Sequence, residues 1–329
     1  MWLLVGCSAP VLPEVDAPAD EPKVEPTVPD SDEPDSEEPD EPDPEPIDTS
    51  VTPERIGDRW RFAGADTVLE IDPTLGARVT RFGVGGVEVL TGASVNTTNF
   101  GATFWTSPQA DWGWPPVEAI DSAPYTATLD GDTLVLTSGA ASLGDTTVTV
   151  EKRVSVDTTG VTLAYTVHNV GDAAVTLAGW EVARVPTGGL TFFRAGTSMT
   201  STVGTFPAEE RGGIVWFDGA APRSGDTKLV ADGSGGWLAH VVDGVLFVET
   251  FADIAAQDQA PSEGEIELFA AEDYVELENQ GALTTIAPGE GVTHTVRWLA
   301  QTVPEGVAVG VGSEGLVGSA ETLSGGGGS

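Results

Sequence analysis

The sequence predicts an all-β protein in which a large antiparallel sandwich takes up most of the 329 residues. Three observations support this prediction. Short stretches rich in valine and threonine alternate with polar residues at a period of two, as half-buried strands do. Glycine is abundant, with 41 residues, and it occurs in hairpin-forming pairs such as Asp130-Gly131. No long stretch shows helical apolar spacing, so we expect helices to contribute little to the core.

The predicted strands begin after Trp60 and follow one another at short intervals. Valines between positions 148 and 156 alternate with polar residues, which indicates one face buried and one exposed. Asp243-Gly244 predicts a second tight hairpin. The predicted strands occupy residues 68–71, 78–82, 87–90, 125–129, 133–137, 148–156, 161–167, 237–242, 245–251, 265–269, 274–278 and 292–299. Strands spaced in this way indicate two packed antiparallel sheets.

Residues 8–50 have a different composition, with eleven prolines, sixteen acidic residues and one lysine. Such a segment cannot bury a core, and its like charges repel, so we expect an extended, disordered spacer. Residues 303–329 are rich in Gly, Val and Ser and are predicted to form a flexible tail. The predicted organisation is a leader remnant (1–6), an anchor cysteine with its acidic linker (7–50), a folded domain (51–302) and the tail (303–329).

Cys7 is the single cysteine of the chain, which excludes an internal disulfide. The order Leu4-Val5-Gly6-Cys7 resembles the lipobox of bacterial lipoproteins, in which the cysteine is lipidated. The six preceding residues are shorter than the apolar core of a signal peptide, roughly 7–15 residues, so we expect a truncated leader. Ser8 suggests outer-membrane sorting in a Gram-negative host. The expected location is the bacterial cell envelope, with a membrane anchor at Cys7.

The formal net charge of −38 argues against nucleic acid as a partner, because phosphate backbones would be repelled. The linker accounts for −15 of this charge. The three histidines lie far apart in the sequence, and no metal-ligand or EF-hand spacing is present. We therefore expect no cofactor and no bound metal. The protein is also expected to be a monomer. Signatures of serine hydrolases, P-loops and dinucleotide-binding folds are also absent.

Residues 99–116 hold three tryptophans, three prolines, Gln109 and Asp111. A proline-stiffened aromatic loop forms a flat apolar wall with hydrogen-bonding edges, which suits the apolar faces and polar rim of a sugar ring. Trp112 and Trp114 flank a glycine, so we expect both to be exposed on a loop. Trp105 and Trp180 lie in strand-like contexts, where core packing and sugar stacking are equally compatible with the pattern.

Several segments together carry a resemblance to a known group: residues 75–82 (LGARVTRF), 86–90 (GVEVL), 165–170 (YTVHNV) and 287–290 (APGE). The first two are similar to the opening hairpin of galactose mutarotase-like domains, the third to a central strand that ends in Asn, and the last to the closing turn of those domains. Residues 104–116, 180–186 (WEVARVP) and 274–281 (YVELENQG) resemble one uncharacterised branch, the DUF4380 family. The resemblance covers about residues 55–302.

The resemblance implies a supersandwich of two large antiparallel sheets that binds carbohydrate on a concave face. Aldose 1-epimerases of this superfamily use a His as general acid and a Glu as general base. Their Asn-x-x-His segment is missing here, because residues 178–181 read AGWE. The base corresponds to Glu276 or Glu278. His240, at the end of a predicted strand, is the first choice for the acid.

Glu276 and Glu278 alternate on one predicted strand, so both point to the same face and require a positive or hydrogen-bonding partner. Arg184 is the candidate partner, and Glu181 lies three residues before it. An arginine and carboxylates in a cleft can bind sugar hydroxyls. The candidate ligand-binding residues are Trp105, Gln109, Trp112, Trp114, Trp180, Glu181 and Arg184, and the candidate catalytic residues are Glu276, Glu278 and His240.

Three functions are compatible with these features. The first is an envelope-anchored protein whose concave cleft binds a saccharide or glycan. The second is a mutarotase-like epimerase or another sugar-active enzyme, which needs an acid and a base at the anomeric centre. The third is a non-catalytic surface protein whose tryptophans all lie in the core. The fold alone does not decide between them, whereas the positions of Trp112, Arg184 and Glu278 would.

Overall fold

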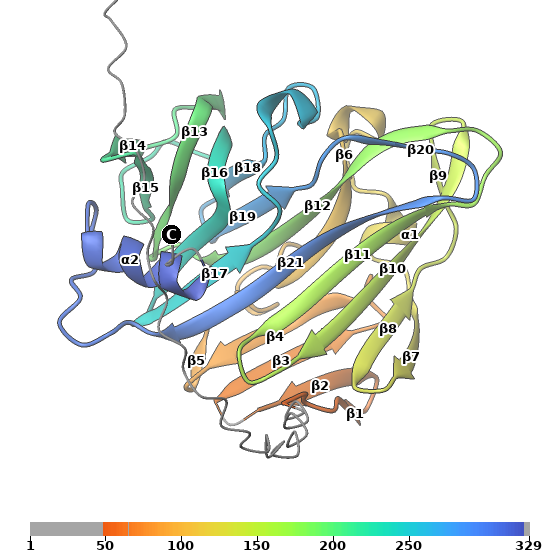
Figure 1. Cartoon of the computed structure of the whole chain (residues 1–329), viewed down its shortest axis with the longest axis horizontal. Coiled ribbons are helices and arrows are strands. Elements are labelled where there is room, and N and C mark those ends of the chain that lie inside the picture. Colours follow the sequence, from red (N-terminus) through yellow and green to blue (C-terminus); the bar gives the residue numbers. More distant parts are fainter. Residues whose placement is uncertain (1–48, 65, 326–329) are drawn as a thin grey trace, which may run out of the picture. The chain divides into compact units, whose positions relative to one another are not determined.

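The computed structural model describes residues 49–64 and 66–325, and residues 48–329 form one compact unit. The predictions for the leader, for Cys7 and for most of the linker 7–50 lie outside the described residues. The described part is built almost entirely of antiparallel strands, which confirms the predicted all-β class. Figure 1 shows long strands that cross the molecule diagonally in two layers. No described helix is long and apolar enough to cross a membrane.

Layer 1 is the sheet that lies in front in Figure 1. Its strands pair in the order β7, β8, β10, β11, β21 and β17, and β9 is added beside β10. The bounds are β7 Thr126–Asp130, β8 Thr133–Thr137, β9 Ala141–Leu143, β10 Thr146–Val156, β11 Val161–Asn169, β17 Val245–Thr250 and β21 Gly291–Thr302. The valines predicted to alternate lie on β10, whose residues are alternately buried and half-buried as expected.

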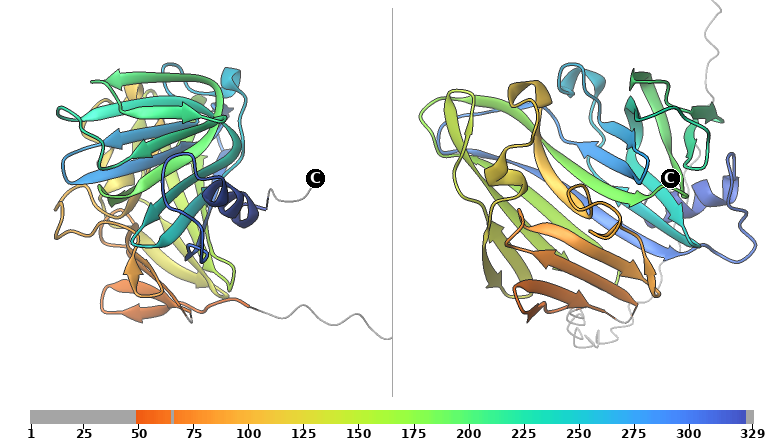
Figure 2. Two further views of the ribbon diagram at one scale, coloured as in Figure 1. Left: turned by 90° about the vertical axis from the view of Figure 1, so that its left-hand side faces the viewer. Right: turned by 180° about the vertical axis from the view of Figure 1, so that it is seen from behind.

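Layer 2 is seen in the right-hand view of Figure 2, where β3 and β4 lie in front. Its strands pair in the order β1, β2, β3, β4, β6, β12, β19 and β18, with β5 beside β4 and β20 beside β12. The bounds are β1 Glu54–Ile56, β2 Arg59–Ala63, β3 Thr67–Asp72, β4 Arg78–Val84, β5 Val87–Glu88, β6 Ala102–Ser107, β12 Val175–Pro186, β18 Ile266–Ala270, β19 Tyr274–Gln280 and β20 Thr284–Ile286.

A long strand, β16 (Thr227–Val242), joins the two layers. Its first half pairs with β18 of layer 2 and its second half with β17 of layer 1. Strand β13 (Leu190–Val203) pairs along β16 and continues the sheet to β15 (Ile214–Asp218) and β14 (Ala208–Arg211). The paired strands therefore form one continuous sheet that folds over on itself.

The core lies between the two layers and is filled with aromatic and branched side chains. Phe82 of layer 2 contacts Phe247 and Trp298 of layer 1, at 5.6 and 5.2 Å between ring centroids. Phe104 stacks on Tyr165 across the same space at 4.6 Å. These contacts define the side of layer 2 that faces layer 1. We call the opposite side of β6, β12, β19 and β18 the outer face.

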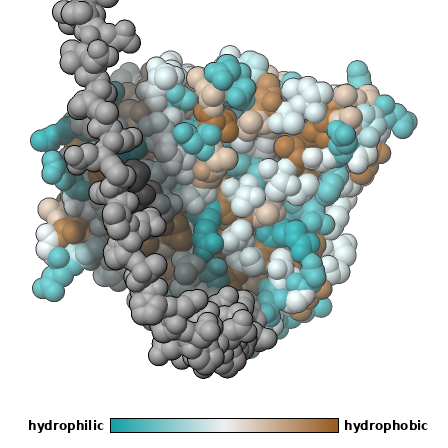
Figure 3. All heavy atoms as spheres, in the orientation of Figure 1, coloured by the Kyte–Doolittle hydropathy of each residue, from teal (hydrophilic) through white to brown (hydrophobic). Residues whose placement is uncertain are grey.

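Helices are few and short: η1 Gln109–Asp111, α1 Glu118–Asp121, η2 Ala256–Asp258 and α2 Glu314–Leu323. Helix α2 corrects the prediction of a flexible tail at 303–329. Leu316 and Ala320 of α2 are fully buried against the end of the sandwich near β17, and the Ser313 side chain accepts a hydrogen bond from the Leu316 amide at the helix start. Hydrophobic spacing at 316, 320 and 323 therefore outweighs the glycine-rich composition of this segment. On the face shown in Figure 3, hydrophobic residues are scattered among hydrophilic ones.

Candidate functional site

The outer face of layer 2 carries polar and aromatic side chains on neighbouring strands. Strand β12 lies between β6 and β19, and its register places Trp180 opposite Trp105 on one side and Gln280 on the other. Arg184 is opposite Glu276 in the same register. Because alternate residues of a strand point to the same side of a sheet, all five side chains project from the outer face. Strand pairing thus brings together residues that are far apart in the sequence.

Glycine at position 101 lets β6 lie this close to β4. A Cβ on Gly101 would stand 2.1 Å from the carbonyl oxygen of Val79, and its φ of +62° is one that other residues adopt at a cost. The backbone of Gly101 also accepts a hydrogen bond from the Arg184 amide at 3.0 Å. The position of Arg184 relative to Trp105 therefore depends on this close backbone approach.

Arg184 and Glu276 form a buried ion pair on the outer face. The Nε of Arg184 donates to Oε1 of Glu276 at 2.9 Å, and its Nη1 donates to the Thr103 hydroxyl at 3.2 Å. The guanidinium also lies over the Trp105 ring, 5.4 Å from its centroid. Arg184 is 1 % exposed, so its charge is removed from water. Its hydrogen bonds hold the guanidinium in one orientation. The structure therefore places a fixed cation and a carboxylate beside an indole.

A second charged group lies beside the first. Nζ of Lys228, at the start of β16, is 2.5 Å from Oε2 of Glu267 and 3.2 Å from Oε2 of Glu278. The same ammonium lies 5.1 Å from the ring centroid of Trp180. Glu267 of β18 is opposite Glu278 of β19 in the sheet, so one lysine is flanked by two neighbouring carboxylates. The outer face therefore presents acids and cations around two indole rings.

Burial alters the proton affinities of this group. Desolvation raises the pKa of Glu278 to about 8, although the nearby ammonium of Lys228 acts in the opposite direction. Desolvation also raises the pKa of Glu267. Burial alone would lower the pKa of Lys228, but the charges of Glu278 and Glu267 outweigh it and raise that pKa. A carboxyl that changes protonation near neutral pH is typical of functional sites.

Several buried polar atoms of the outer face have no hydrogen-bond partner within the described part of the chain. They are Nε1 of Trp180, Oε1 of Glu278 and Oε1 of Gln280. Buried polar atoms are satisfied in most proteins, and each one left unpaired costs about 1–3 kcal/mol. Trp180 of β12 is opposite Gln280 of β19, and Glu278 lies two residues before Gln280 on the same side of β19. The face therefore offers one donor and two acceptors to a hydrogen-bonding ligand or to ordered water.

The tryptophans differ in exposure. Trp105 and Trp180 are buried at 5 % and 1 %, and they meet edge to face at 5.2 Å between centroids. Trp112 is half-buried rather than exposed, because its indole packs on this pair and its Nε1 donates to the Thr106 carbonyl at 2.7 Å. Trp114 is exposed, as predicted, at 63 %. The aromatic loop therefore presents one open indole beside a packed group of three.

Glu181 requires a correction, because it points away from the outer face. It lies one residue from Trp180 on β12, so its side chain enters the core between the layers. There its Oε1 accepts from the Tyr165 hydroxyl at 2.6 Å, and its Oε2 accepts from Asn279 Nδ2 at 3.1 Å and from Trp298 Nε1 at 3.3 Å. A fully buried carboxylate held by three donors is part of the packing.

His240 lies apart from the outer face, whereas the backbone amide of Gln109 is linked to that face through Glu263, which also accepts from Gln280 Nε2 at 3.1 Å. The His240 ring is buried against Gly189 and hydrogen-bonds the Thr191 hydroxyl at 2.9 Å through Nδ1. Burial lowers the pKa of His240 to about 3, so at neutral pH the ring is uncharged and lacks the acidic proton of an imidazolium. Gln109 lies on η1, where its backbone amide donates to Glu263 Oε1 at 2.6 Å. The structure thus gives no support to His240 as the acid.

The sequence interpretation missed Lys228 and Glu267. Lys228 is one of three lysines in the chain, and it lies within an alternating strand pattern. The scarcity of cations could have identified Lys228 as a candidate, since the chain has 14 Lys and Arg residues and 52 acidic ones. Glu267 lies on β18, and a second glutamate, Glu265, immediately precedes that strand at an alternate position. Their proximity to Glu278 depends on strand order, which a single sequence does not reveal.

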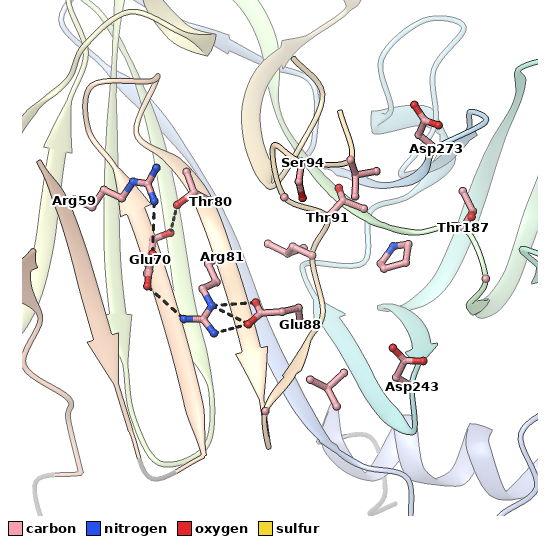
Figure 4. A pocket seen from close by; sticks show the side chains of 17 residues that line it. Arg59, Glu70, Thr80, Arg81, Glu88, Thr91, Ser94, Thr187, Asp243 and Asp273 are labelled. Atoms are coloured by element: carbon pink, nitrogen blue, oxygen red, sulfur yellow. Dashed lines mark hydrogen bonds and ion pairs between the residues drawn. The ribbon is translucent and has the colours of Figure 1, made fainter. Parts of the chain in front are cut away.

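A hollow of ≈ 780 Å³ lies elsewhere in the described part of the chain. Figure 4 shows Arg81 between Glu88 and Glu70, and Arg59 on the far side of Glu70. These charges pair with one another at a surface open to solvent, where such pairs are worth little. This hollow contains none of the predicted site residues. Among the described residues, no group of three or more His, Cys, Asp or Glu could hold a metal ion.

Comparisons with known proteins address the fold. No family model matches the chain, so the likeness to the DUF4380 family stays a prediction, and no curated protein matches it in sequence. Among solved structures, a galactose mutarotase-like protein from Clostridium acetobutylicum has a TM-score of 0.51 at 11% identity over 77% of this chain and 98% of its own. A galactose mutarotase-like protein from Lactobacillus casei has a TM-score of 0.51 at 11% identity over 74% and 100%.

A galactose mutarotase-related enzyme from Lactobacillus acidophilus has a TM-score of 0.50 at 7% identity, and the match covers 75% of this chain and 98% of that protein. Identities this low establish the fold and leave the function open. The two-layered sandwich formed by the described residues therefore has a galactose mutarotase-like supersandwich fold, as the sequence predicted.

Proposed function

We propose that the outer face of layer 2 binds a saccharide. The observation that carries the proposal is the set of unpaired buried polar atoms on Trp180, Glu278 and Gln280. A sugar ring supplies hydroxyls that both donate and accept, and its C–H faces pack on indole rings. Arg184 and Glu276, fixed by their ion pair, stand beside these groups. The galactose mutarotase-like fold adds support by analogy alone.

Calorimetric titration of the protein with a broad sugar panel, with and without calcium, tests this proposal. We expect at least one sugar to bind, and Glu278→Gln to weaken its binding up to about tenfold, since the variant replaces the O–H donor of the neutral carboxyl and a net hydrogen bond between neutral groups is worth roughly 0.5–1.5 kcal/mol. Glu88→Gln is the matched control, because Glu88 lies in the larger hollow shown in Figure 4. Binding to no sugar of the panel, or equal losses in the two variants, would contradict the proposal.

A second candidate is a mutarotase-like epimerase, and the raised pKa of Glu278 favours it. With a pKa of about 8, Glu278 carries a proton at neutral pH and can donate it to the ring oxygen as the bond from that oxygen to the anomeric carbon breaks. Glu276 projects from the same face and can accept the proton of the anomeric hydroxyl. Rotation and ring closure then give the other anomer, with the reverse proton transfers.

Anomeric exchange of glucose and galactose, followed by NMR, tests the enzyme. Catalysed exchange should slow above about pH 8 as Glu278 loses its proton. Glu276→Gln and Glu278→Gln should each lower the rate at least about 100-fold, the lower end for a general acid or base. Full activity in both variants would contradict the assignment of Glu278 as the acid and Glu276 as the base. Binding without exchange would leave the protein a saccharide-binding module.

We also propose that the chain is attached to the bacterial envelope by a lipid on Cys7, with residues 8–50 as the spacer. The lipobox-like order at residues 4–7 and the acidic, proline-rich segment after it support this. In a bacterial host, the protein should fractionate with membranes, and Cys7→Ser should move it to the soluble fraction. Equal membrane association of both forms would contradict the anchor.

A further inference from the structure

A separate hollow of ≈ 490 Å³ adjoins the outer face at Trp105. Its lining includes Arg78, Asn99, Trp105, Trp114 and Glu118. The volume lies within the range of small-molecule sites, roughly 300–1,000 Å³. The aromatic loop forms one wall through Trp114 and the two prolines that follow it. Charged groups and an open indole thus line the same space.

Trp114 is held in place although its indole is mostly exposed. The ring meets Trp105 edge to face, at 6.1 Å and 89°. The loop before it is fixed by the Gly113 amide, which donates to the Gln109 carbonyl at 2.8 Å, and by the Trp112 indole on Thr106. Helix α1 follows shortly after it. Because the Trp114 indole is mostly exposed, it contributes little to the core. A tryptophan held in place at the surface is typical of binding sites.

Arg78 gives the hollow a cation with an unused donor. It is 4 % exposed, its Nη1 donates to the Thr98 carbonyl at 2.6 Å, and its Nη2 lies 3.6 Å from Asp121. The guanidinium stands 4.9 Å from the ring centroid of Phe100. Its Nε has no partner among the described residues. Burial lowers the pKa of Arg78 to about 10, which leaves it charged at neutral pH.

The hollow is connected to the outer face through shared residues. Trp105 lies between Trp180 and Trp114, at 5.2 and 6.1 Å between ring centroids. Asn99 lines the hollow and donates to the Tyr274 hydroxyl at 2.8 Å. Tyr274 is two residues before Glu276 on β19, so both belong to the outer face. The hollow and the outer face therefore share the Trp105 ring and are joined by the contact between Asn99 and Tyr274.

We infer that the hollow under Trp114 is a second sugar subsite, so that the ligand of this protein is an oligosaccharide or a longer glycan. One ring occupies the outer face beside Trp180, and the next stacks on Trp114 and reaches the free Nε of Arg78. A single sugar would leave Trp114 and Arg78 unused. This inference rests on the proposed saccharide binding and specifies its substrate class.

The test compares affinity with chain length. Wild-type protein and Trp114→Ala are titrated calorimetrically with glucose and galactose, with maltose to maltotetraose and with cellobiose to cellotetraose. In the wild type, affinity should rise at least about tenfold from one ring to two or three rings in at least one series. In Trp114→Ala, this gain with length should disappear. Trp114→Phe, which keeps an aromatic face, should retain part of it.

Leu129→Ala is the matched control, because Leu129 is also exposed, at 47 %, but lies on β7 of layer 1. This variant should keep the full gain with length. If single sugars bind and longer ones bind no better, the inference falls and the proposed function stands. It also falls if Trp114→Ala keeps the gain. If no sugar of any length binds, both are overturned.

Discussion

Strand β12 serves two buried polar groups, one on each of its sides. Glu181 enters the core, where Tyr165, Asn279 and Trp298 donate to it. We call these residues, with Glu249 and His294, the inner cluster. Arg184 points the other way and pairs with Glu276 on the outer face. The same strand therefore offers a direct comparison between two polar environments of similar burial.

The two groups differ in what they use as partners. In the inner cluster, Asn279 links both carboxylates, since its Nδ2 lies 3.1 Å from Glu181 and 3.1 Å from Glu249, and its Oδ1 contacts His294 at 2.7 Å. Desolvation raises the pKa of Glu249 well above its usual range, and the charge of the neighbouring Glu181 acts in the same direction. The inner cluster thus relies on amide, hydroxyl and indole groups.

The outer face instead combines cations and carboxylates and leaves polar atoms of three side chains unpaired. The inner cluster leaves one atom without a partner among the described residues, Oε1 of Glu249, and its other hydrogen bonds stabilise the packing of the two layers. The outer face fixes its charges and leaves one donor and two acceptors unpaired among the described residues, which supports the proposed ligand site. The two groups are buried to a similar degree, so burial does not distinguish a structural role from a functional one. The kind of partner and the number of unpaired polar atoms do distinguish them.

The largest effect is expected from breaking the outer ion pair. Arg184→Met leaves Glu276 buried without its cation, which should lower the free energy of unfolding by about 3–5 kcal/mol. The double variant Arg184→Met/Glu276→Met should recover most of that loss, yet both variants should lose saccharide binding. Urea unfolding and calorimetry measure the two properties. If the double variant bound sugar with wild-type affinity, the ion pair would have no part in binding, and the contrast between the outer face and the inner cluster would be contradicted.

A somewhat smaller effect is expected in the inner cluster. Glu181→Leu removes the acceptor for Tyr165, Asn279 and Trp298, and should lower the free energy of unfolding by about 3 kcal/mol. The folded fraction should bind saccharide with unchanged affinity, because Glu181 faces the core. Loss of binding in a fully folded variant would place Glu181 in the site after all.

A buried lysine in the core should make the free energy of unfolding depend on pH. Lys152 is buried, its Nζ donates to the Gly76 carbonyl at 2.6 Å, and burial lowers its pKa from 10.5 to about 7. Between these values the folded protein binds fewer protons than the unfolded one, so stability should rise with pH, by at most about 1.4 kcal/mol per pH unit. Lys152→Met should flatten this rise in urea unfolding measured from pH 7 to 10. An unchanged slope would contradict it.

The outer face should show the opposite slope at lower pH. The pKa of Glu278 is raised from 4.5 to about 8, so the folded protein holds a proton that the unfolded protein loses. Its contribution to stability is complete below pH 4.5 and is lost as the pH rises to about 8. Glu278→Gln should make stability less dependent on pH in this window. Because Glu267 and Lys228 are coupled to Glu278, we expect a partial flattening, smaller than that for Lys152.

Much of the fold was predictable from local pattern. The Asp130-Gly131 and Asp243-Gly244 hairpins are present, between β7 and β8 and between β16 and β17. Alternation along β10 and β11 identified their buried faces. Helix α2 was missed because the glycine content of its segment masked a short apolar spacing.

The candidate site was predictable only in part. The rule that alternate residues share a face predicts that Glu276 and Glu278 project together, and the structure has them so. The same rule, applied to positions 181 and 184, would have separated Glu181 from Arg184. The neighbours of Lys228 were not predictable, because they depend on the pairing of β16 with β18 and of β18 with β19. Register between distant strands is a property of the whole sheet.

A crystal structure of the protein soaked with the tightest-binding sugar of the panel tests the central claim most directly. We predict electron density for a sugar ring against Trp180, with hydroxyls within hydrogen-bonding distance of Oε1 of Glu278 and Oε1 of Gln280. Sugar density confined to the hollow around Arg81, or an outer face that stays free of sugar at saturating concentration, would contradict the account.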